Sequence, residues 1–254
     1  MPHTPWTEEQ LTLALNLYCK IPFGRIQASN PEIVQLAELI GRTPSALAFK
    51  LSNFASFDPA LQARGVKGLA NASKLDREVW DRFFGNLGEL AFHSEMLLAK
   101  KQQQSVEQWL SEAERQLPEG KTKERLVQQR VNQQFFRSMI LNFYNRSCCI
   151  TGISQSDLLV AAHISPWSVD PANRMNPANG LCLNALHDKA YEAGWITITP
   201  EYKVLVSSKF QKPHVAPWTT NYFLAYHEQP IHLPKHFSPD PALLERHLVE
   251  RFQK

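Results

Sequence analysis

The stretch CCITGISQSDLLVAAHISPWSVDPANRMNPANGLCLNALHDKAYEAGWITI, residues 148–198, decides how this chain is interpreted. It begins with two short runs of strand-forming residues, at 148–151 and 158–162, with Gly and Ser between them. The second run ends on His163. This order predicts a pair of short strands whose end presents a histidine.

The second half of the stretch has the pattern of a loop followed by a helix. After His163 the sequence is rich in Pro, Asn and Asp, which favour turns. Asn179-Gly180 is expected to open a helix that carries His187 and ends at Gly194. A last β-type run, 195–199, closes a ββα unit with one histidine on each arm.

Three residues of this unit carry a resemblance to a known family. His163 in AAHISPW, Asn179 in NPANGL and His187 in ALHDKAYEAG are spaced 16 and 8 positions apart, and together they resemble the HNH endonuclease family. The resemblance is to a bacterial subgroup with restriction-endonuclease-like proteins. It implies a ββα-metal fold, nuclease activity and a divalent metal.

The resemblance also implies a role for each of these residues. His163 would be the general base, which suits a side chain whose pKa lies near neutrality. His187 would be a metal ligand, and Asn179 would hold the loop through backbone hydrogen bonds. Many members carry Asp or Glu just before the first histidine, where this chain has Ala162. Mg²⁺ is the expected metal, with Mn²⁺, Ni²⁺ and Zn²⁺ as alternatives. Asp188 and Glu192 are considered as additional ligands, but Glu192 is expected to cap or brace the helix rather than to bind the metal.

Composition sets wider limits on the function. The net charge of +3 is too small to establish nucleic-acid binding by itself. No apolar run is long enough to span a membrane, and the start of the chain does not resemble a targeting segment. The four cysteines form no C-x-x-C pair, so we expect buried thiols in a reducing cytoplasm. Five histidines of the C-terminal part lack regular ligand spacing and are expected to be surface or packing residues: His214, His227, His232, His236 and His247.

The N-terminal part is expected to be helical. Thr7 is a candidate cap for a first helix, and residues 30–56 have the pattern of a helix-turn-helix with Gly41 in the turn. The second of these helices would contact DNA, with Lys50 and Asn53 among its exposed residues. Packing without any DNA contact is the alternative for this helix pair.

Two further helices are expected in the segment that precedes the HNH-like stretch in the sequence. Residues 76–100 form an apolar helix with Trp80, Phe83 and Phe84, which either pairs with a second copy of the chain or packs on the N-terminal helices. Residues 101–120 resemble a linker with a short helix around Trp109. Residues 121–147 carry six Lys or Arg against one acidic residue, and a long helix there would contact DNA. Its candidate contacts are Arg130, Gln134 and Arg137.

Together these observations predict an α+β protein with two parts. Residues 1–120 would be a helical region for DNA binding or dimerisation, and residues 121–254 a nuclease domain with its core at 148–198. The predicted function is a metal-dependent DNA endonuclease that acts on double-stranded DNA as a homodimer, in restriction or defence. Two alternatives stay open: a non-catalytic DNA-binding protein with a degenerate HNH fold, and a nuclease that acts on RNA or as a toxin.

Overall fold

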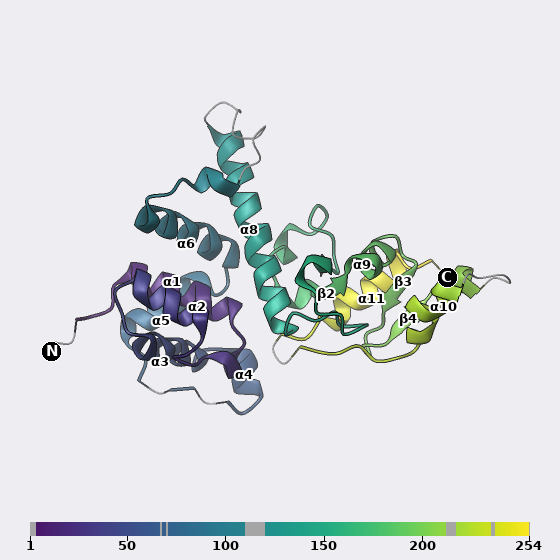
Figure 1. Ribbon diagram of the computed structural model, residues 1–254, viewed down its shortest axis with the longest axis horizontal. Coiled ribbons are helices and arrows are strands. Elements are labelled where there is room, and N and C mark those ends of the chain that lie inside the picture. Colours follow the sequence, from purple (N-terminus) through teal and green to yellow (C-terminus); the bar gives the residue numbers. More distant parts are fainter. Residues whose placement is uncertain are drawn as a thin grey trace. The chain divides into compact units, whose positions relative to one another are not determined.

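The chain folds into two compact units, Met1–Met139 and Ile140–Lys254. The computed structural model (Figure 1) describes residues 4–66, 68–69, 71–109, 120–211, 217–234 and 237–253. The α+β class is confirmed, since helices make up the first unit and two small hairpins with helices make up the second. The division between the units falls inside a long helix, later than the boundary expected at residue 120. Among the described helices, none has the length and apolar character needed to cross a membrane.

Unit 1 is a bundle around its first helix. Its helices are α1 Glu8–Lys20, α2 Pro31–Leu39, α3 Pro44–Ala55, α4 Pro59–Ala63, α5 Lys74–Phe83, α6 Leu87–Gln102 and α8 Lys121–Phe143, the last of which continues into unit 2, with 3₁₀ turns η1 Phe23–Arg25 and η2 Val106–Trp109. Helix α1 packs against α2, α3, α5 and α6. Thr7 caps α1 in a reciprocal capping box with Gln10, as the sequence indicated. Residues 110–119 of the expected linker lie outside the described residues.

The expected helix pair at residues 30–56 is present as α2 and α3. Asn30 caps α2, Thr43 caps α3, and the turn between them contains Gly41 with a φ of 67°. Such a positive φ costs a glycine little, which explains the residue at this turn. The two helices pack against each other. Their assignment as a helix-turn-helix that contacts DNA stays a prediction.

The apolar helix expected at 76–100 is divided into α5 and α6. Helix α5 ends at Phe83, and Asn86 caps α6 three residues later. Trp80 and Phe83 are buried, and Phe84 stacks on Trp80 with ring centroids 3.9 Å apart. Because α5 packs against α1 and α3, these aromatic residues are covered by their own unit. Internal packing, the alternative given for this helix, accounts for the burial of Trp80 and Phe83, and the homodimer itself stays a prediction.

Unit 2 contains two antiparallel hairpins. Its elements are η3 Ser156–Leu158, β1 Leu159–His163, η4 Pro171–Asn173, η5 Pro177–Asn179, β2 Gly180–Asn184, α9 Ala185–Glu192, β3 Ile196–Ile198, β4 Val204–Val206, η6 Ser208–Gln211, α10 Pro217–Tyr222, η7 Leu224–Tyr226 and α11 Pro241–Glu250. Strand β1 pairs with β2, and β3 pairs with β4. Helix α9 packs on β1, β2 and β3, and α11 packs on β3.

The first strand pair differs from the one expected. Residues 148–151 form a turn, in which the backbone N–H of Gly152 donates to the carbonyl of Cys148 at 2.9 Å. The partner of β1 is instead residues 180–184, which were expected to begin a helix. All five residues of β2 are buried, so the strand lacks the alternation of polar and apolar residues that would have revealed it. The helix starts later, at Ala185, and the side chain of Asn184 caps it by accepting from the backbone N–H of His187 at 3.0 Å.

Gly194 ends helix α9 where the chain passes close to the C-terminal segment. Its φ is 74°, and a Cβ at this position would collide with the backbone oxygen of Arg251. The carbonyl of Gly194 accepts a hydrogen bond from the backbone N–H of Gln253 at 2.9 Å. Glycine is therefore required both for the backbone conformation and for this close approach.

Candidate active site

The end of strand β1 and the start of β2 bring His163 and Asn179 together. In the antiparallel register His163 pairs with Gly180, the residue after Asn179. The backbone N–H of Ile164 donates to the carbonyl of Asn179 at 2.9 Å, which closes the hairpin across a 15-residue connection, residues 164–178. His163 and Asn179, which flank this connection in the sequence, therefore lie close together where the loop leaves the two strands.

Asn179 holds the loop through its side chain. It is fully buried, and its Oδ1 accepts from the backbone N–H of Ser165 at 2.7 Å. Its Nδ2 donates to the carbonyls of Ser165 and Asn173, at 3.1 and 3.0 Å. The expected backbone hydrogen bonds of Asn179 are therefore confirmed. An amide is suited to this position because it offers donors and an acceptor at once.

The ring of His163 is half-buried and held by the same loop. Its Nε2 lies 3.0 Å from the carbonyl oxygen of Arg174, and its ring meets Trp167 edge to face at 5.5 Å. Since a carbonyl only accepts hydrogen bonds, Nε2 carries the proton, and Nδ1 is the basic nitrogen of the neutral ring. Burial lowers the pKa of His163, against the opposing effect of the Arg174 carbonyl. The neutral, proton-accepting form is thus favoured near pH 7.

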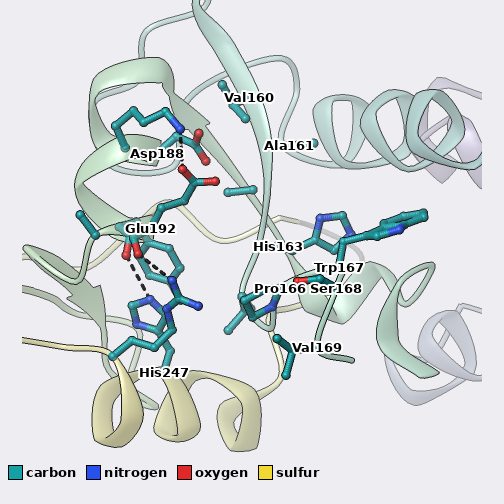
Figure 2. Close-up of a pocket in the computed structure, with 16 residues that line it drawn as sticks. Val160, Ala161, His163, Pro166, Trp167, Ser168, Val169, Asp188, Glu192 and His247 are labelled. Atoms are coloured by element: carbon teal, nitrogen blue, oxygen red, sulfur yellow. Dashed lines mark hydrogen bonds and ion pairs between the residues drawn. The ribbon is translucent and has the colours of Figure 1, made fainter. Parts of the chain in front are cut away.

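Strand β1 and helix α9 line a cavity of about 670 Å³ that includes His163. Asp188 and Glu192 belong to its lining as well. In Figure 2 the His163 ring lies beside Trp167, on the opposite side of the strand from Asp188 and Glu192. Buried His247, which also lines the cavity, stacks on Tyr191 with centroids 3.8 Å apart, so its expected packing role is confirmed.

His187 is placed differently from the expectation. It is buried, it is absent from the lining of this cavity, and both of its ring nitrogens have protein partners. Nδ1 lies 3.1 Å from Nδ2 of Asn184, and Nε2 lies 2.6 Å from the carbonyl oxygen of Tyr222. Phe223 and Tyr226 contact the ring edge to face. A metal would have to displace these partners, so His187 does not fit the role of a metal ligand in this arrangement.

His187 belongs to a small cluster of polar side chains. Asn184 Nδ2 also lies 3.3 Å from Thr151 Oγ1 and 3.7 Å from Cys148 Sγ. Burial raises the pKa of Cys148, but hydrogen bonds from His187, Thr151 and the backbone outweigh this and bring the pKa to about 7. The cluster fastens the turn at 148–151 to the first turn of α9.

A comparison with known protein families finds a match, which lies within unit 2. Residues 148–199 match the family model described as HNH endonuclease. These residues form an HNH endonuclease domain. The match covers about a fifth of the chain, and a comparison of the chain with curated proteins finds no match. The domain implies nuclease activity and a nucleic-acid substrate.

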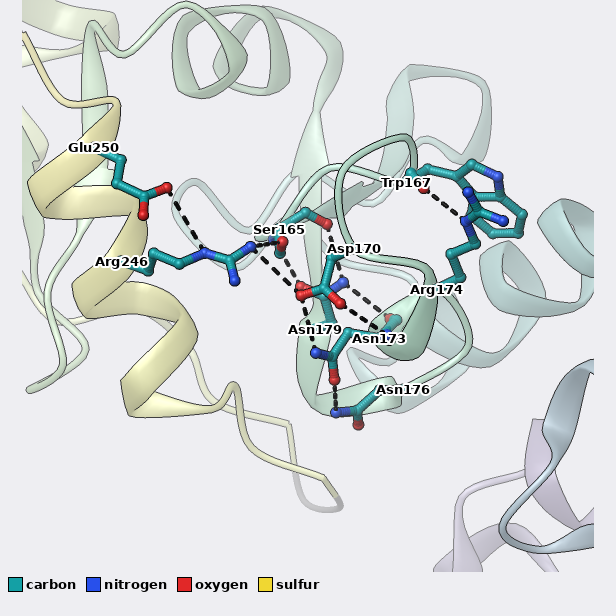
Figure 3. A network of polar contacts seen from close by, with 9 residues as sticks. All are labelled: Ser165, Trp167, Asp170, Asn173, Arg174, Asn176, Asn179, Arg246 and Glu250. Carbon is teal, nitrogen blue, oxygen red and sulfur yellow. Dashed lines mark hydrogen bonds and ion pairs between the residues drawn. The ribbon is translucent and has the colours of Figure 1, made fainter.

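The loop of the HNH domain is also fastened from outside the matched residues. Arg246 of α11 donates to Ser165 Oγ and lies 3.4 Å from Asp170, as Figure 3 shows. Asp170 in turn accepts from the side chain of Asn173 at 3.0 Å, which lowers the Asp170 pKa. Sequence reasoning missed Arg246, because 76 residues separate it from Asp170 and no local pattern links them.

The HNH family is typically metal-dependent, and the two acidic residues of α9 fit a metal better than His187 does. No group of three His, Cys, Asp or Glu side chains is gathered for a metal within the described part of the chain. Asp188 and Glu192 are one helical turn apart and line the same cavity, on the other side of strand β1 from the His163 ring. Burial, together with the charge of Glu192, raises the pKa of Asp188 to about 6. Two neighbouring carboxylates of this kind suit Mg²⁺, which completes its coordination with water and phosphate oxygens.

The candidate DNA contacts of unit 1 fall into two groups. Arg130 and Gln134 on α8 are exposed and Arg137 is half-buried, in agreement with the face expected for them. Lys50 and Asn53 on α3 are buried. The ammonium of Lys50 lies 2.9 Å from both carboxylate oxygens of buried Asp76, so the expectation that Lys50 and Asn53 are exposed was wrong.

Proposed function

We propose that the protein is a metal-dependent endonuclease that hydrolyses phosphodiester bonds of double-stranded DNA. The observation that carries this proposal is the state of His163. Its Nε2 is tied to the Arg174 carbonyl, its pKa is lowered, and it belongs to the lining of a cavity at the end of strand β1. A neutral imidazole with a fixed tautomer is what a general base for water requires.

In the proposed reaction, His163 takes a proton from the attacking water. The water oxygen forms a new bond to phosphorus, the bond to the leaving oxygen breaks, and the leaving oxygen acquires a proton from solvent. As the ring becomes charged, the Arg174 carbonyl stabilises the imidazolium through its hydrogen bond from Nε2. Asn179 keeps the loop in place during this change, because its three hydrogen bonds fix the backbone at Ser165 and Asn173.

Asp188 and Glu192 are the residues that we assign to the divalent metal, with Mg²⁺ as the first choice. The metal would supply positive charge for the phosphate oxygens. Both carboxylates must be ionised for this purpose, and Glu192 forms an ion pair with Lys189 at 2.6 Å.

Two parts of the proposal, the homodimer and the role in restriction or defence, do not rest on the geometry of the site. One active site cuts one strand, so a double-strand break needs either two copies of the chain or two successive nicks. With the aromatic face of α5 covered, a homodimer is supported only by this requirement. A role in bacterial restriction or defence rests on the family resemblance.

A cleavage assay tests the proposal. Supercoiled plasmid, linear duplex DNA and a single-stranded RNA of equal length would be incubated with the full chain and Mg²⁺, Mn²⁺ or EDTA. We expect nicked or linear plasmid with metal and none with EDTA. Binding without cleavage under every metal condition would instead favour a degenerate, non-catalytic HNH protein, and preferential RNA cleavage would favour the RNA-directed alternative.

A further inference from the structure

Unit 1 contains a second cavity that the HNH reaction does not use. Its volume is about 620 Å³, and it lies between the outer side of α3, the segment before α1 and the segment before α5 (Figure 1 labels these helices). The residues that matter for its chemistry are Trp6, Phe49, Lys50 and Asn53. All of them belong to the described part of unit 1.

Two aromatic residues, Trp6 and Phe49, belong to the lining of this cavity. Phe49 is 61% exposed, although its neighbours on α3, Leu47 and Leu51, are fully buried. Trp6 is half-buried, and the cationic groups of Arg42 and Lys50 lie 4.6 and 5.3 Å from its ring centre. An exposed phenylalanine beside a cavity leaves apolar surface in water, which a planar ligand would cover.

Asn53 gives the same cavity an acceptor without a donor. Its side chain is buried, and no donor within the described residues reaches its Oδ1. Its Nδ2 makes one long hydrogen bond, 3.4 Å, to the carbonyl of Asn71. A buried acceptor without a partner is unfavourable, so a ligand that brings an N–H group to Oδ1 would be bound specifically.

The charges in the cavity exclude a phosphate as its main ligand. Lys50 is its only cationic lining residue among those described, and both oxygens of Asp76 already neutralise it at 2.9 Å. Asp76 is fully buried, so this pair is held in place. The cavity therefore suits a neutral, planar group with an N–H donor.

We propose that this cavity binds one unpaired nucleobase of the nucleic-acid substrate, stacked on Phe49 with its exocyclic amino group directed to Asn53 Oδ1. The proposal rests on the nucleic-acid substrate of the proposed function. A base inside a duplex cannot present both its face and its edge in this way, so the base must be single-stranded or extruded. Stacking accepts every base, whereas the acceptor of Asn53 selects bases that carry an amino group.

A fluorescent base tests the stacking. An oligonucleotide with one unpaired 2-aminopurine would be titrated with the full chain in EDTA, so that it stays intact. We expect the fluorescence to be quenched by the wild-type protein, and Phe49→Ala to weaken binding about five- to a hundredfold and remove the quenching. Met96→Ala is the matched control, because Met96 is an exposed apolar residue of α6 outside this cavity. Equal quenching by Phe49→Ala and wild type would overturn the proposal.

A change of one atom group in the base tests the role of Asn53. Replacing an unpaired adenine by purine, which lacks the amino group, should weaken binding to wild type about three- to tenfold. Asn53→Ala should bind the two oligonucleotides equally. Equal binding of both by the wild-type protein would overturn the assignment of the amino group.

The same oligonucleotides separate this proposal from the proposed function. With Mg²⁺ or Mn²⁺ present, cleavage by the wild-type chain reports on the HNH site alone. Cleavage without any quenching at the same protein concentration would overturn the base pocket and leave the endonuclease proposal standing. Quenching without cleavage would support the pocket and count against the endonuclease.

Discussion

The strand end that carries His163 and the helix start that carries His187 provide the two histidines of one HNH domain, yet their surroundings are opposite. His163 is half-buried and lines a cavity, and its Nε2 is hydrogen-bonded to the backbone carbonyl of Arg174. His187 is buried, and protein partners occupy both of its ring nitrogens. The difference teaches that matching a motif identifies a residue, while its hydrogen bonds decide whether the residue can do chemistry or only support the fold.

Removing His163 should have the largest effect on activity. We expect His163→Ala to lower the cleavage rate about 10²- to 10⁴-fold, as is usual when a general base is lost. Circular dichroism and DNA affinity should stay unchanged. His232→Ala is the control, since His232 is an exposed histidine of the same unit. Cleavage by His163→Ala at the rate of His232→Ala would show that another group accepts the proton.

His187 should matter for stability in the first place. His187→Leu would remove the hydrogen bonds that the buried His187 ring makes with the Tyr222 carbonyl and the Asn184 amide. We expect a loss of about 2–3 kcal/mol in the free energy of unfolding, measured by urea denaturation. Calorimetric titration of the folded variant should give a metal affinity close to that of the wild type. A large loss of affinity with intact stability would restore His187 as a ligand.

Asp188 should show the opposite behaviour. We expect Asp188→Asn to lower metal affinity about tenfold or more, with little loss of stability. Because the Asp188 pKa is raised to about 6, its ionised form disappears as the pH falls from 7 to 5, and the wild-type metal affinity should fall with it. In the absence of metal, the free energy of unfolding should change in the opposite direction. The folded state favours the protonated Asp188 carboxyl, so the contribution of Asp188 to stability increases as the pH falls through 6. A metal affinity that does not change between pH 7 and 5 would exclude Asp188.

The smallest effect is expected at the contact between α11 and the active-site loop. Arg246→Gln and Asp170→Asn should each lower the cleavage rate a few-fold, because the pair orders the loop without touching the reacting atoms. In a double-mutant cycle the coupling should be about 0.5–1 kcal/mol, typical of a partly exposed ion pair. Additive effects of the two substitutions would mean that α11 does not act on the loop through this pair.

Local patterns were enough to locate most helices. Thr7, Asn30 and Thr43 each cap the helix expected after them, because capping depends on a few neighbouring residues. The strand β2 was missed because it does not depend on neighbouring residues alone. Its pairing with β1 depends on residues about 20 positions away, and its full burial removes the alternation that marks a strand.

The sequence by itself determined that residues 148–199 are an HNH domain and that His163 and Asn179 share one loop, since both follow from a short motif. Only the tertiary structure decided that Asp188 lines the cavity and His187 does not, because adjacent residues on a helix point in directions about 100° apart. It alone placed Arg246 on the loop and brought Trp6 and Phe49 to the same cavity of unit 1. Such contacts depend on how helices pack, and a packing contact between distant residues leaves no periodic signal in one sequence.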